Sequence, residues 1–287
     1  MFIDKTVILK NVLKARAFFL DLLFPIECLS CGREGEWLCQ RCFGKIRFNE
    51  TQYCFHCKKE KERGQFCRAC QQAYFPDGVW IAGDYEDKLL MEMVKNLKYR
   101  FAKDIAGALS KFLILFLNSM ENSPLITAGA GQVKGVRGII GKKWLIIPVP
   151  LHPRRLRWRG FNQAEEIARA VAEHFGIKME SGILVRTKHK QPQVKLNMKE
   201  RAENIKGCFT IKEPPLLKGG KGGFKNSLDK GPFRQSECEA RDWGILSNRN
   251  IILLDDVATT GATLNECARV LKANGAREVW GLVAAKG

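Results

Sequence analysis

The sequence predicts an α/β protein: a parallel β-sheet flanked by helices, preceded by a small cysteine-rich module. Two apolar runs, residues 144–149 and 251–254, have the unbroken hydrophobicity of strands buried on both faces, as strands of parallel sheets are. A pattern typical of an amphipathic helix follows each run, which is the alternation expected of this class. Eight of the eleven cysteines lie between Cys28 and Cys70, and they mark the separate module.

The stretch from Ile251 to Thr263 carries the most specific chemistry. Its apolar strand ends in Asp255 and Asp256, and a short loop of small and hydroxylated residues then leads into a helix. Loop amides, threonine hydroxyls and a helix N-terminus can bind a phosphate, and Gly261 lets the backbone come close to a ligand. The two carboxylates would repel a bare phosphate, but they suit a pair of sugar hydroxyls or Mg²⁺. We therefore expect a ribose-5-phosphate group at this strand end; the alternative is an ordinary turn with Asp and Thr as turn and cap residues.

The other apolar run leads into a cationic segment. Residues 144–149 are expected to form a strand, and the segment after Pro150 carries His152 and four arginines at positions 154, 155, 157 and 159. The sequence Arg-Gly-Phe-Asn-Gln at 159–163 then precedes a helix that ends at Gly176. If this loop lies beside Asp255, a pyrophosphate would be held there. The alternative is a solvated charged surface.

The eight clustered cysteines form four Cys-x-x-Cys pairs, which we group as two quartets. The first contains Cys28, Cys31, Cys39 and Cys42, and the second contains Cys54, Cys57, Cys67 and Cys70. Each pair can present two sulfurs to one tetrahedral metal, so about two structural Zn²⁺ ions are expected. The usual iron–sulfur spacings are absent from the sequence. Spacing does not decide whether the pairs close sequentially or interleave, and His56 is expected to be a bystander.

Charge and composition bound the function classes. The net charge of +18 favours anionic partners such as phosphorylated substrates or nucleic acid, or else has no single target. Residues 7–24 form an apolar stretch that charged residues interrupt, which excludes a secretory signal or a membrane span and predicts an amphipathic helix. Reduced, metal-bound thiolates are then expected in the cytoplasm. The predicted division is a helix at 1–25, a double zinc ribbon at 26–75 and an α/β domain at 76–287.

The remaining elements of the α/β domain follow from their patterns. Strands are expected at 80–85 and 278–285, and helices at 88–98 and 104–120. The Gly-rich residues 122–143 predict a loop, and the basic, aperiodic residues 186–209 predict a mobile flap over the site. Low complexity at 213–248 predicts a disordered insertion.

These motifs resemble a known family. The stretch Ile251 to Thr263 resembles the phosphoribosyl pyrophosphate (PRPP) signature of type I phosphoribosyltransferases: apolar strand, Asp-Asp, Val, a small residue, Thr-Thr-Gly, a small residue, Thr. The order of cysteine module, Pro-Val-Pro, Arg-Gly-Phe-Asn-Gln, flap and signature resembles the ComF family of bacterial phosphoribosyltransferase-like proteins, tied to natural competence and DNA uptake. The resemblance covers nearly the whole chain, and it departs from the family pattern at 122–143 and 213–248.

The resemblance implies a type I phosphoribosyltransferase-like sheet and a role for each part of the site. Asp255 and Asp256 would be the catalytic pair and would bind the ribose hydroxyls, with Mg²⁺ accompanying PRPP. The 5′-phosphate would lie in a cradle formed by Val257, Ala258, Thr259, Thr260, Gly261, Ala262 and Thr263. Pyrophosphate would be bound by Val149, Pro150, Arg154 and Arg159. The flap would contribute Gln191, Lys195 and Arg201.

Two functions remain open at this point. One is a glycosyltransferase that moves the phosphoribosyl group of PRPP to an acceptor that no motif names, releasing pyrophosphate. The other is a non-catalytic accessory of DNA uptake, whose phosphate site and basic zinc module bind single-stranded DNA and competence proteins without turnover. The sequence specifies no oligomeric state.

Overall fold

The computed structural model of the protein describes residues 26–61, 63–99, 104–121, 144–188, 198–212 and 245–287. The helix predicted at 1–25 and the loop predicted at 122–143 lie outside these ranges, as do Gln191, Lys195 and nearly all of the stretch predicted to be inserted at 213–248. None of the helices in the described ranges combines the length and the apolar character that crossing a membrane requires.

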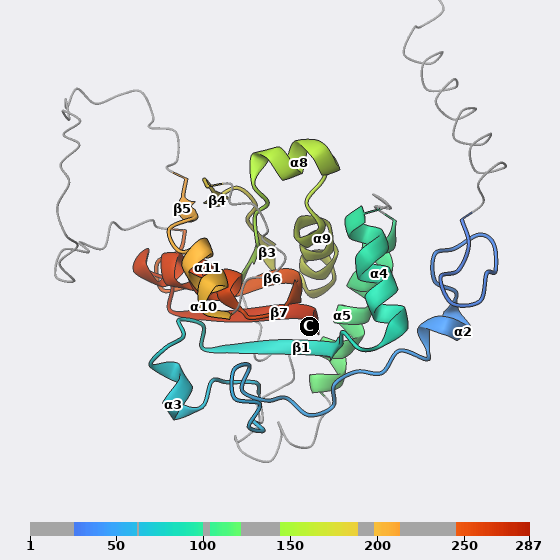
Figure 1. The fold of residues 1–287 in the computed structure, drawn as a ribbon, viewed down its shortest axis with the longest axis horizontal. Helices are drawn as coiled ribbons and strands as arrows, with labels where there is room; N and C mark the ends of the chain where they lie inside the picture. Colours follow the sequence, from blue (N-terminus) through green and yellow to red (C-terminus); the bar gives the residue numbers. More distant parts are fainter. Residues whose placement is uncertain (1–25, 62, 100–103, 122–143, 189–197, 213–244) are drawn as a thin grey trace, which may run out of the picture.

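A five-stranded parallel sheet forms the centre of the protein (Figure 1). Its strands are β1 (Gly78–Asp84), β2 (Trp144–Pro148), β3 (Lys178–Met179), β6 (Asn250–Ala258) and β7 (Glu278–Lys286). They lie in the order β1-β7-β6-β2-β3, and every neighbouring pair is parallel. The continuous apolar runs are thus the central strands of a sheet covered on both faces, as the sequence predicts.

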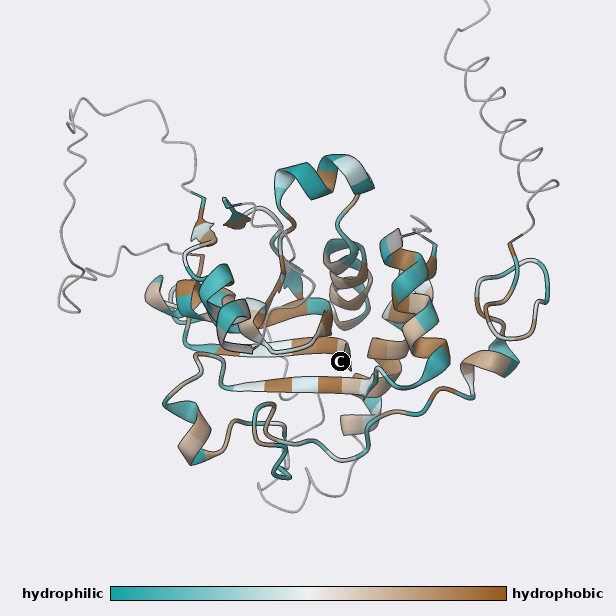
Figure 2. Ribbon diagram, in the orientation of Figure 1, coloured by the Kyte–Doolittle hydropathy of each residue, from teal (hydrophilic) through white to brown (hydrophobic). Residues whose placement is uncertain are grey.

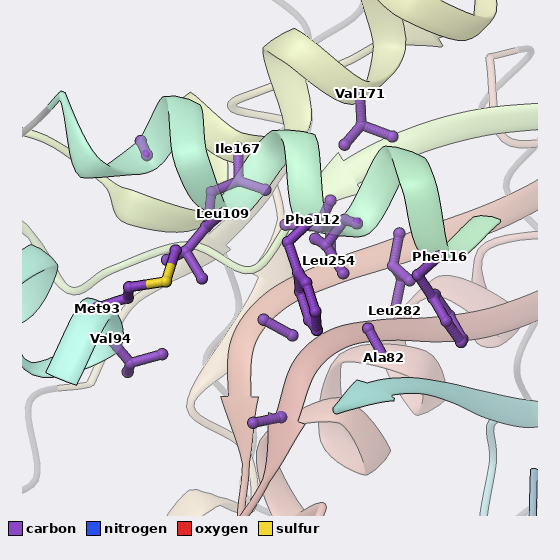
Figure 3. Close-up of a cluster of buried hydrophobic side chains, with 14 of the residues drawn as sticks. Ala82, Met93, Val94, Leu109, Phe112, Phe116, Ile167, Val171, Leu254 and Leu282 are labelled. Atoms are coloured by element: carbon purple, nitrogen blue, oxygen red, sulfur yellow. The ribbon is translucent and has the colours of Figure 1, made fainter. Parts of the chain in front are cut away.

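Helices cover the two faces of this sheet. The helices α4 (Lys88–Tyr99), α5 (Ile105–Glu121) and α9 (Gln163–Phe175) share one core with Ile252 and Leu254 of β6. The helix α11 (Ala262–Ala273) shares the second core with Ile251 and Leu253. Side chains of a strand alternate between faces, so one apolar run supplies both cores. Figure 2 shows the strands as mostly hydrophobic, and Figure 3 shows Phe112 and Phe116 of α5 packed above Leu254 and Leu282.

The cysteine module packs against both halves of this body. Its short helices α2 (Gln40–Phe43) and α3 (Arg68–Gln71) each begin directly after a cysteine. The first ribbon contacts α5, where Phe48 stacks on Phe112 with ring centroids 4.9 Å apart. Between the ribbons, buried Gln52 accepts a hydrogen bond from the backbone N–H of Ile81 and donates one to its carbonyl, at 3.0 and 3.1 Å. The second ribbon shares the core that contains α11.

The structure corrects the expectation of a loop at 151–159. Residues Pro153–Arg159 form a helix, α8, which projects from the carboxyl end of the sheet (Figure 1). Pro153 stands at the first helical position, His152 caps it by accepting from the N–H of Arg154, and Gly160 ends it at a φ of 81°. Seven residues with no buried side chain show no amphipathic period, so the pattern alone reads as a charged loop.

The stretch predicted to be an aperiodic flap also contains regular structure. The strands β4 (Leu184–Arg186) and β5 (Phe209–Ile211) form an antiparallel pair, and the helix α10 (Met198–Ile205) precedes β5. Gly207 donates its N–H to the buried carboxylate of Glu266 on α11 at 2.7 Å, which fixes the base of this segment. At the end of the stretch predicted to be inserted, residues 245–248 form a packed turn in which Leu246 is fully buried. That part of the expectation is wrong.

Candidate functional site

The loop after β6 has the backbone of an anion site. Ala258 ends the strand, Gly261 adopts a φ of 73° as the N-cap of α11, and the helix begins at Ala262. Thr259 is exposed and Thr260 is half-buried, with the Thr260 hydroxyl accepting from the N–H of Ala262 at 3.4 Å. A helix N-terminus preceded by hydroxyl groups at the carboxyl end of a central strand can bind a phosphate.

The two carboxylates are part of β6 itself, one turn of the pleat before this loop. Asp255 accepts a hydrogen bond from the N–H of Asp256 at 2.9 Å, and Asp256 accepts one from Val257 at 2.7 Å. Asp256 also pairs with Lys98 of α4 at 2.9 Å, and its side chain is only 8% exposed. The strand thus extends beyond the predicted apolar run and carries both carboxylates into the site.

The electrostatics of the pair favour a cation or a hydrogen-bond donor at Asp255. Burial and the negative charge of Asp256 raise the pKa of Asp255 to about 8. Burial opposes the charge of Lys98, but the carboxylates of Asp256 and Asp255 outweigh it and raise the pKa of Lys98. One lysine therefore neutralises one carboxylate. Asp255 is left to hold a proton, a sugar hydroxyl or a divalent ion.

The loop after β2 lies directly beside this pair. The N–H of Val149 donates to the carbonyl of Leu254 at 2.8 Å, which continues the parallel pairing of β2 with β6 to the edge of the site. Asn162 holds the same loop by donating to the carbonyl of Val149 at 3.1 Å. The structure therefore brings Val149 and Pro150 to the residue before Asp255, as the sequence predicts if the two loops are neighbours.

Buried polar atoms without protein partners accompany this loop. The oxygen Oδ1 of Asn162 and the nitrogen Nε2 of Gln163 make no hydrogen bond within the described residues, although the two residues are only 8% and 2% exposed. Leaving a buried polar atom unpaired costs about 1–3 kcal/mol. Such atoms are common where a ligand or water completes the site. Both residues belong to the Arg-Gly-Phe-Asn-Gln segment.

Arg186 is a site residue that sequence reasoning missed. It ends β4, its guanidinium lies over the Phe209 ring at 5.5 Å, and its Nε has no hydrogen-bond partner within the described residues. Burial and the nearby charge of Arg155 lower the pKa of Arg186, while Asp255 is among the groups that raise it. Two arginines from separate elements thus approach each other near the carboxylates, an arrangement that an anion would stabilise. No periodicity in residues 184–188 could have shown this position.

The other predicted residues are placed less closely. Arg154 is exposed and Arg159 is half-buried on α8. Arg201 lies on α10, whose backbone is described there, and Gln191 and Lys195 lie outside the described residues.

The cysteines form two four-sulfur clusters. In each quartet, 28/31/39/42 and 54/57/67/70, the four sulfurs all lie within 4.8 Å of one another, so the pairs close sequentially. The Cys31–Cys39 and Cys57–Cys67 sulfurs are 3.7 and 3.6 Å apart. With zinc–sulfur bonds of about 2.3 Å, sulfurs at the corners of a tetrahedron are about 3.8 Å apart. These clusters therefore fit structural zinc, and the separation is far too long for a disulfide.

The backbone prepares one thiolate in each cluster. Burial opposes ionisation of Cys28 and Cys54, but backbone N–H groups of the knuckles lower both pKa values to about 6. Among these donors, the N–H of Cys39 lies 3.4 Å from the sulfur of Cys28. The ring nitrogen Nδ1 of His56 lies 2.7 Å from the Tyr74 hydroxyl, and His56 is outside the sulfur cluster.

Comparison with known proteins agrees with both parts of the chain. Residues 19–71 match the family model described as a double zinc ribbon domain. The chain is 28% identical over 272 residues to competence protein F of Haemophilus influenzae, covering 91% of this chain and 98% of the relative. It is 26% identical over 253 residues to the DNA utilization protein YhgH of Escherichia coli O157:H7, covering 86% and 90%.

A further relative extends the similarity to another bacterium. Competence protein ComFC of Bacillus subtilis is 25% identical over 242 residues, which cover 84% of this chain and 80% of the relative. The matches run through both the cysteine module and the α/β body. The chain is therefore a homologue of the ComF, ComFC and YhgH proteins over most of its length, with a double zinc ribbon at its N-terminal end.

Proposed function

We propose that the protein is a PRPP-binding phosphoribosyltransferase-like protein of the ComF type. The observation that carries the proposal is the pairing of Asp255 with a glycine-capped phosphate loop at the carboxyl end of β6. Since burial and Asp256 raise the pKa of Asp255 to about 8, this carboxylate gains most from a ligand that brings a hydroxyl or a cation. A ribose with a 5′-phosphate would supply both contacts at once.

Each part of the site has a role in this proposal. The loop 257–263 binds the 5′-phosphate, Asp255 and Asp256 orient the ribose hydroxyls, and the Val149–Pro150 loop holds the pyrophosphate. Arg186 and Arg155 add positive charge where the leaving group accumulates negative charge. As the bond to pyrophosphate breaks, the ribose gains oxocarbenium character, and cations that hold the departing group stabilise this state.

Mg²⁺ fits the same site, because carboxylate and phosphate oxygens are its preferred ligands. When bound, it would neutralise part of the pyrophosphate charge. Asp255 and Asp256 are the residues that would hold it, directly or through water. We also propose that the protein works in a reducing compartment such as the cytoplasm, where the eight ligand thiols stay reduced.

Turnover is tested by pyrophosphate release. We expect zinc-loaded protein to release pyrophosphate from PRPP and Mg²⁺ when a panel of amines, nucleobases and nucleic-acid ends is offered as acceptor. Asp255→Asn/Asp256→Asn protein is the control, since it lacks the charge that orients the ribose. PRPP binding without release under every acceptor would favour a non-catalytic binding protein.

A DNA-handling role is the second candidate, and α8 favours it. Trp158 and Leu156 are 62% and 42% exposed on this helix, beside four arginines and no acidic residue. Aromatic rings among arginines suit single-stranded nucleic acid, where bases stack and phosphates pair with cations. Relatives named for competence and DNA utilization are compatible with such a partner.

The prediction for this surface is a loss of single-stranded DNA binding. Trp158→Ala is expected to weaken binding of an oligonucleotide about fivefold or more, because each stacked base contributes about 1–3 kcal/mol. Replacing Arg154 and Arg157 by Gln should lower the slope of log K against log salt by about 2. Phe75→Ala is the matched control, since Phe75 is an exposed ring (44%) on the other side of the module. Equal losses in both variants would place the contact outside α8.

A further inference from the structure

We propose that Phe55, in the second zinc ribbon, is a positioning residue that holds the phosphate loop in its binding conformation. The inference rests on the proposed function, because it concerns how tightly that loop binds a sugar phosphate. It assigns to the zinc ribbon a direct part in ligand binding, through one ring and one carbonyl group.

The Phe55 ring lies against Gly261, the residue that caps α11. A Cβ atom built on Gly261 would lie 2.6 Å from Cε1 of Phe55 and 3.1 Å from Cδ1. The ring is 3% exposed, so it is sealed between the ribbon and the loop. Gly261 is thus required twice, by its φ of 73° and by the absence of space for any side chain.

The backbone of Phe55 is tied to the same place from the other side. Lys286, at the end of β7, donates from Nζ to the carbonyl of Phe55 at 2.6 Å. Its ammonium lies over the Phe55 and Tyr53 rings, 4.5 and 5.3 Å from their centroids. Since Lys286 pairs in register with Ala258, the last residue of β6, the knuckle is anchored to the strand that leads into the loop.

The rest of the second ribbon continues along α11. The N–H of Phe75 donates to Oδ1 of Asn265 at 2.7 Å, one turn after Gly261. Asp77 pairs with Lys272 at 2.8 Å, two turns further along the same helix. The ribbon therefore contacts the cap, the first turn and the last turn of the helix whose N-terminus faces the proposed phosphate.

The zinc site fixes Phe55, because Cys54 and Cys57 are ligands on either side of it. A bound zinc ion closes the knuckle and restricts the Phe55 backbone. The loop in turn needs restriction, since a loop that is ordered before binding loses less entropy when its ligand binds. The first ribbon lacks this link, and its Phe48 packs on α5 instead.

The test compares two buried phenylalanines of one ribbon. Phe55→Ala is expected to weaken PRPP binding about tenfold by calorimetry, and Phe55→Leu should weaken it less. Phe66→Ala is the matched control, because Phe66 is also 3% exposed but stacks on Tyr74, with ring centroids 4.8 Å apart. It should bind PRPP within about twofold of the unmodified protein. Zinc content is measured in all three and is expected to be unchanged.

A second readout needs no ligand. Hydrogen exchange of the amides of residues 259–264 should be faster in Phe55→Ala than in Phe66→Ala. The inference is overturned if unmodified protein binds PRPP and Phe55→Leu or Phe55→Ala binds it equally well. It is also overturned if Phe66→Ala loses as much affinity. If unmodified protein does not bind PRPP, the proposed function fails, and unchanged exchange at 259–264 would then reject the role of Phe55 separately.

Discussion

Removing zinc is expected to have the largest effect on this protein. Structural zinc sites of this kind contribute about 10–16 kcal/mol of binding free energy, and little of the module's stability comes from apolar packing within it. The two sulfur clusters predict about two Zn²⁺ per chain. Chelation should unfold residues 26–75 first, followed by hydrogen exchange and proteolysis within the module. Metal analysis that finds iron, or no metal in folded protein, would contradict this reading.

A pair of buried cysteines separates metal binding from packing. Cys42 and Cys208 are both fully buried, but only Cys42 belongs to a quartet. Cys42→Ser should lower the free energy of unfolding by more than about 4 kcal/mol and release one zinc per chain. Cys208→Ser should cost under about 2 kcal/mol, because a hydroxyl can still donate to the Asn204 carbonyl that the Cys208 thiol contacts. Similar losses in both would show that burial, and not metal, stabilises the module.

The second large effect concerns Asp255 and Asp256, whose stability effects should have opposite signs. Asp255→Asn is expected to raise the free energy of unfolding at pH 7 by about 2 kcal/mol, because it removes a buried charge that Asp256 repels. Asp256→Asn should lower it by about 1–2 kcal/mol, because Lys98 loses its partner. Thermal and denaturant unfolding measure both. Together, the two substitutions should weaken PRPP binding by about 2–3 kcal/mol.

The pH dependence follows from the same shift. An aspartate in an unfolded chain has a pKa of about 3.9, and that of Asp255 is about 8 in the folded protein. Between these values the folded state holds a proton that the unfolded state has released. Asp255 therefore makes the protein less stable as pH rises from about 4 to about 8. In Asp255→Asn this contribution should disappear, and an unchanged pH profile would contradict the burial argument.

An ordinary capping aspartate provides the control for the turn-and-cap alternative. Asp87 accepts hydrogen bonds from the N–H groups of Leu89 and Leu90 at 2.9 and 3.0 Å, as an N-cap residue does. Asp87→Asn or Asp87→Ala should therefore cost stability without any change in PRPP binding. If Asp255 behaved in the same way, its role would be structural only.

Residues with strong local patterns were predictable from the sequence. The run Ile251 to Leu254 becomes a central strand, because four apolar residues in a row satisfy a sheet covered on both faces. The cysteine spacing predicts the two quartets, and the structure adds their sequential closure. The position of Val149 beside the carboxylates followed once two strand–loop–helix units were placed in one parallel sheet.

Residues whose roles depend on distant contacts were not predictable. Arg186 lies near Asp255 only because a short antiparallel pair folds back on α11, and three-residue strands carry no readable period. Phe55 resembles a residue of a small ribbon core, and only the packed structure shows it against Gly261, 206 positions away in the chain. The charged helix α8 has no buried side chain, so nothing in its pattern distinguishes it from a loop.

The central claim is that the loop after β6 binds the ribose-5-phosphate part of PRPP. The most direct measurement is a calorimetric titration of zinc-loaded protein with PRPP, with and without Mg²⁺. We expect one saturable site per chain, tighter with Mg²⁺, with weaker binding of ribose 5-phosphate because it lacks the pyrophosphate that Val149, Pro150 and the arginines would contact. Folded, zinc-loaded protein that binds neither compound under either condition would contradict the account.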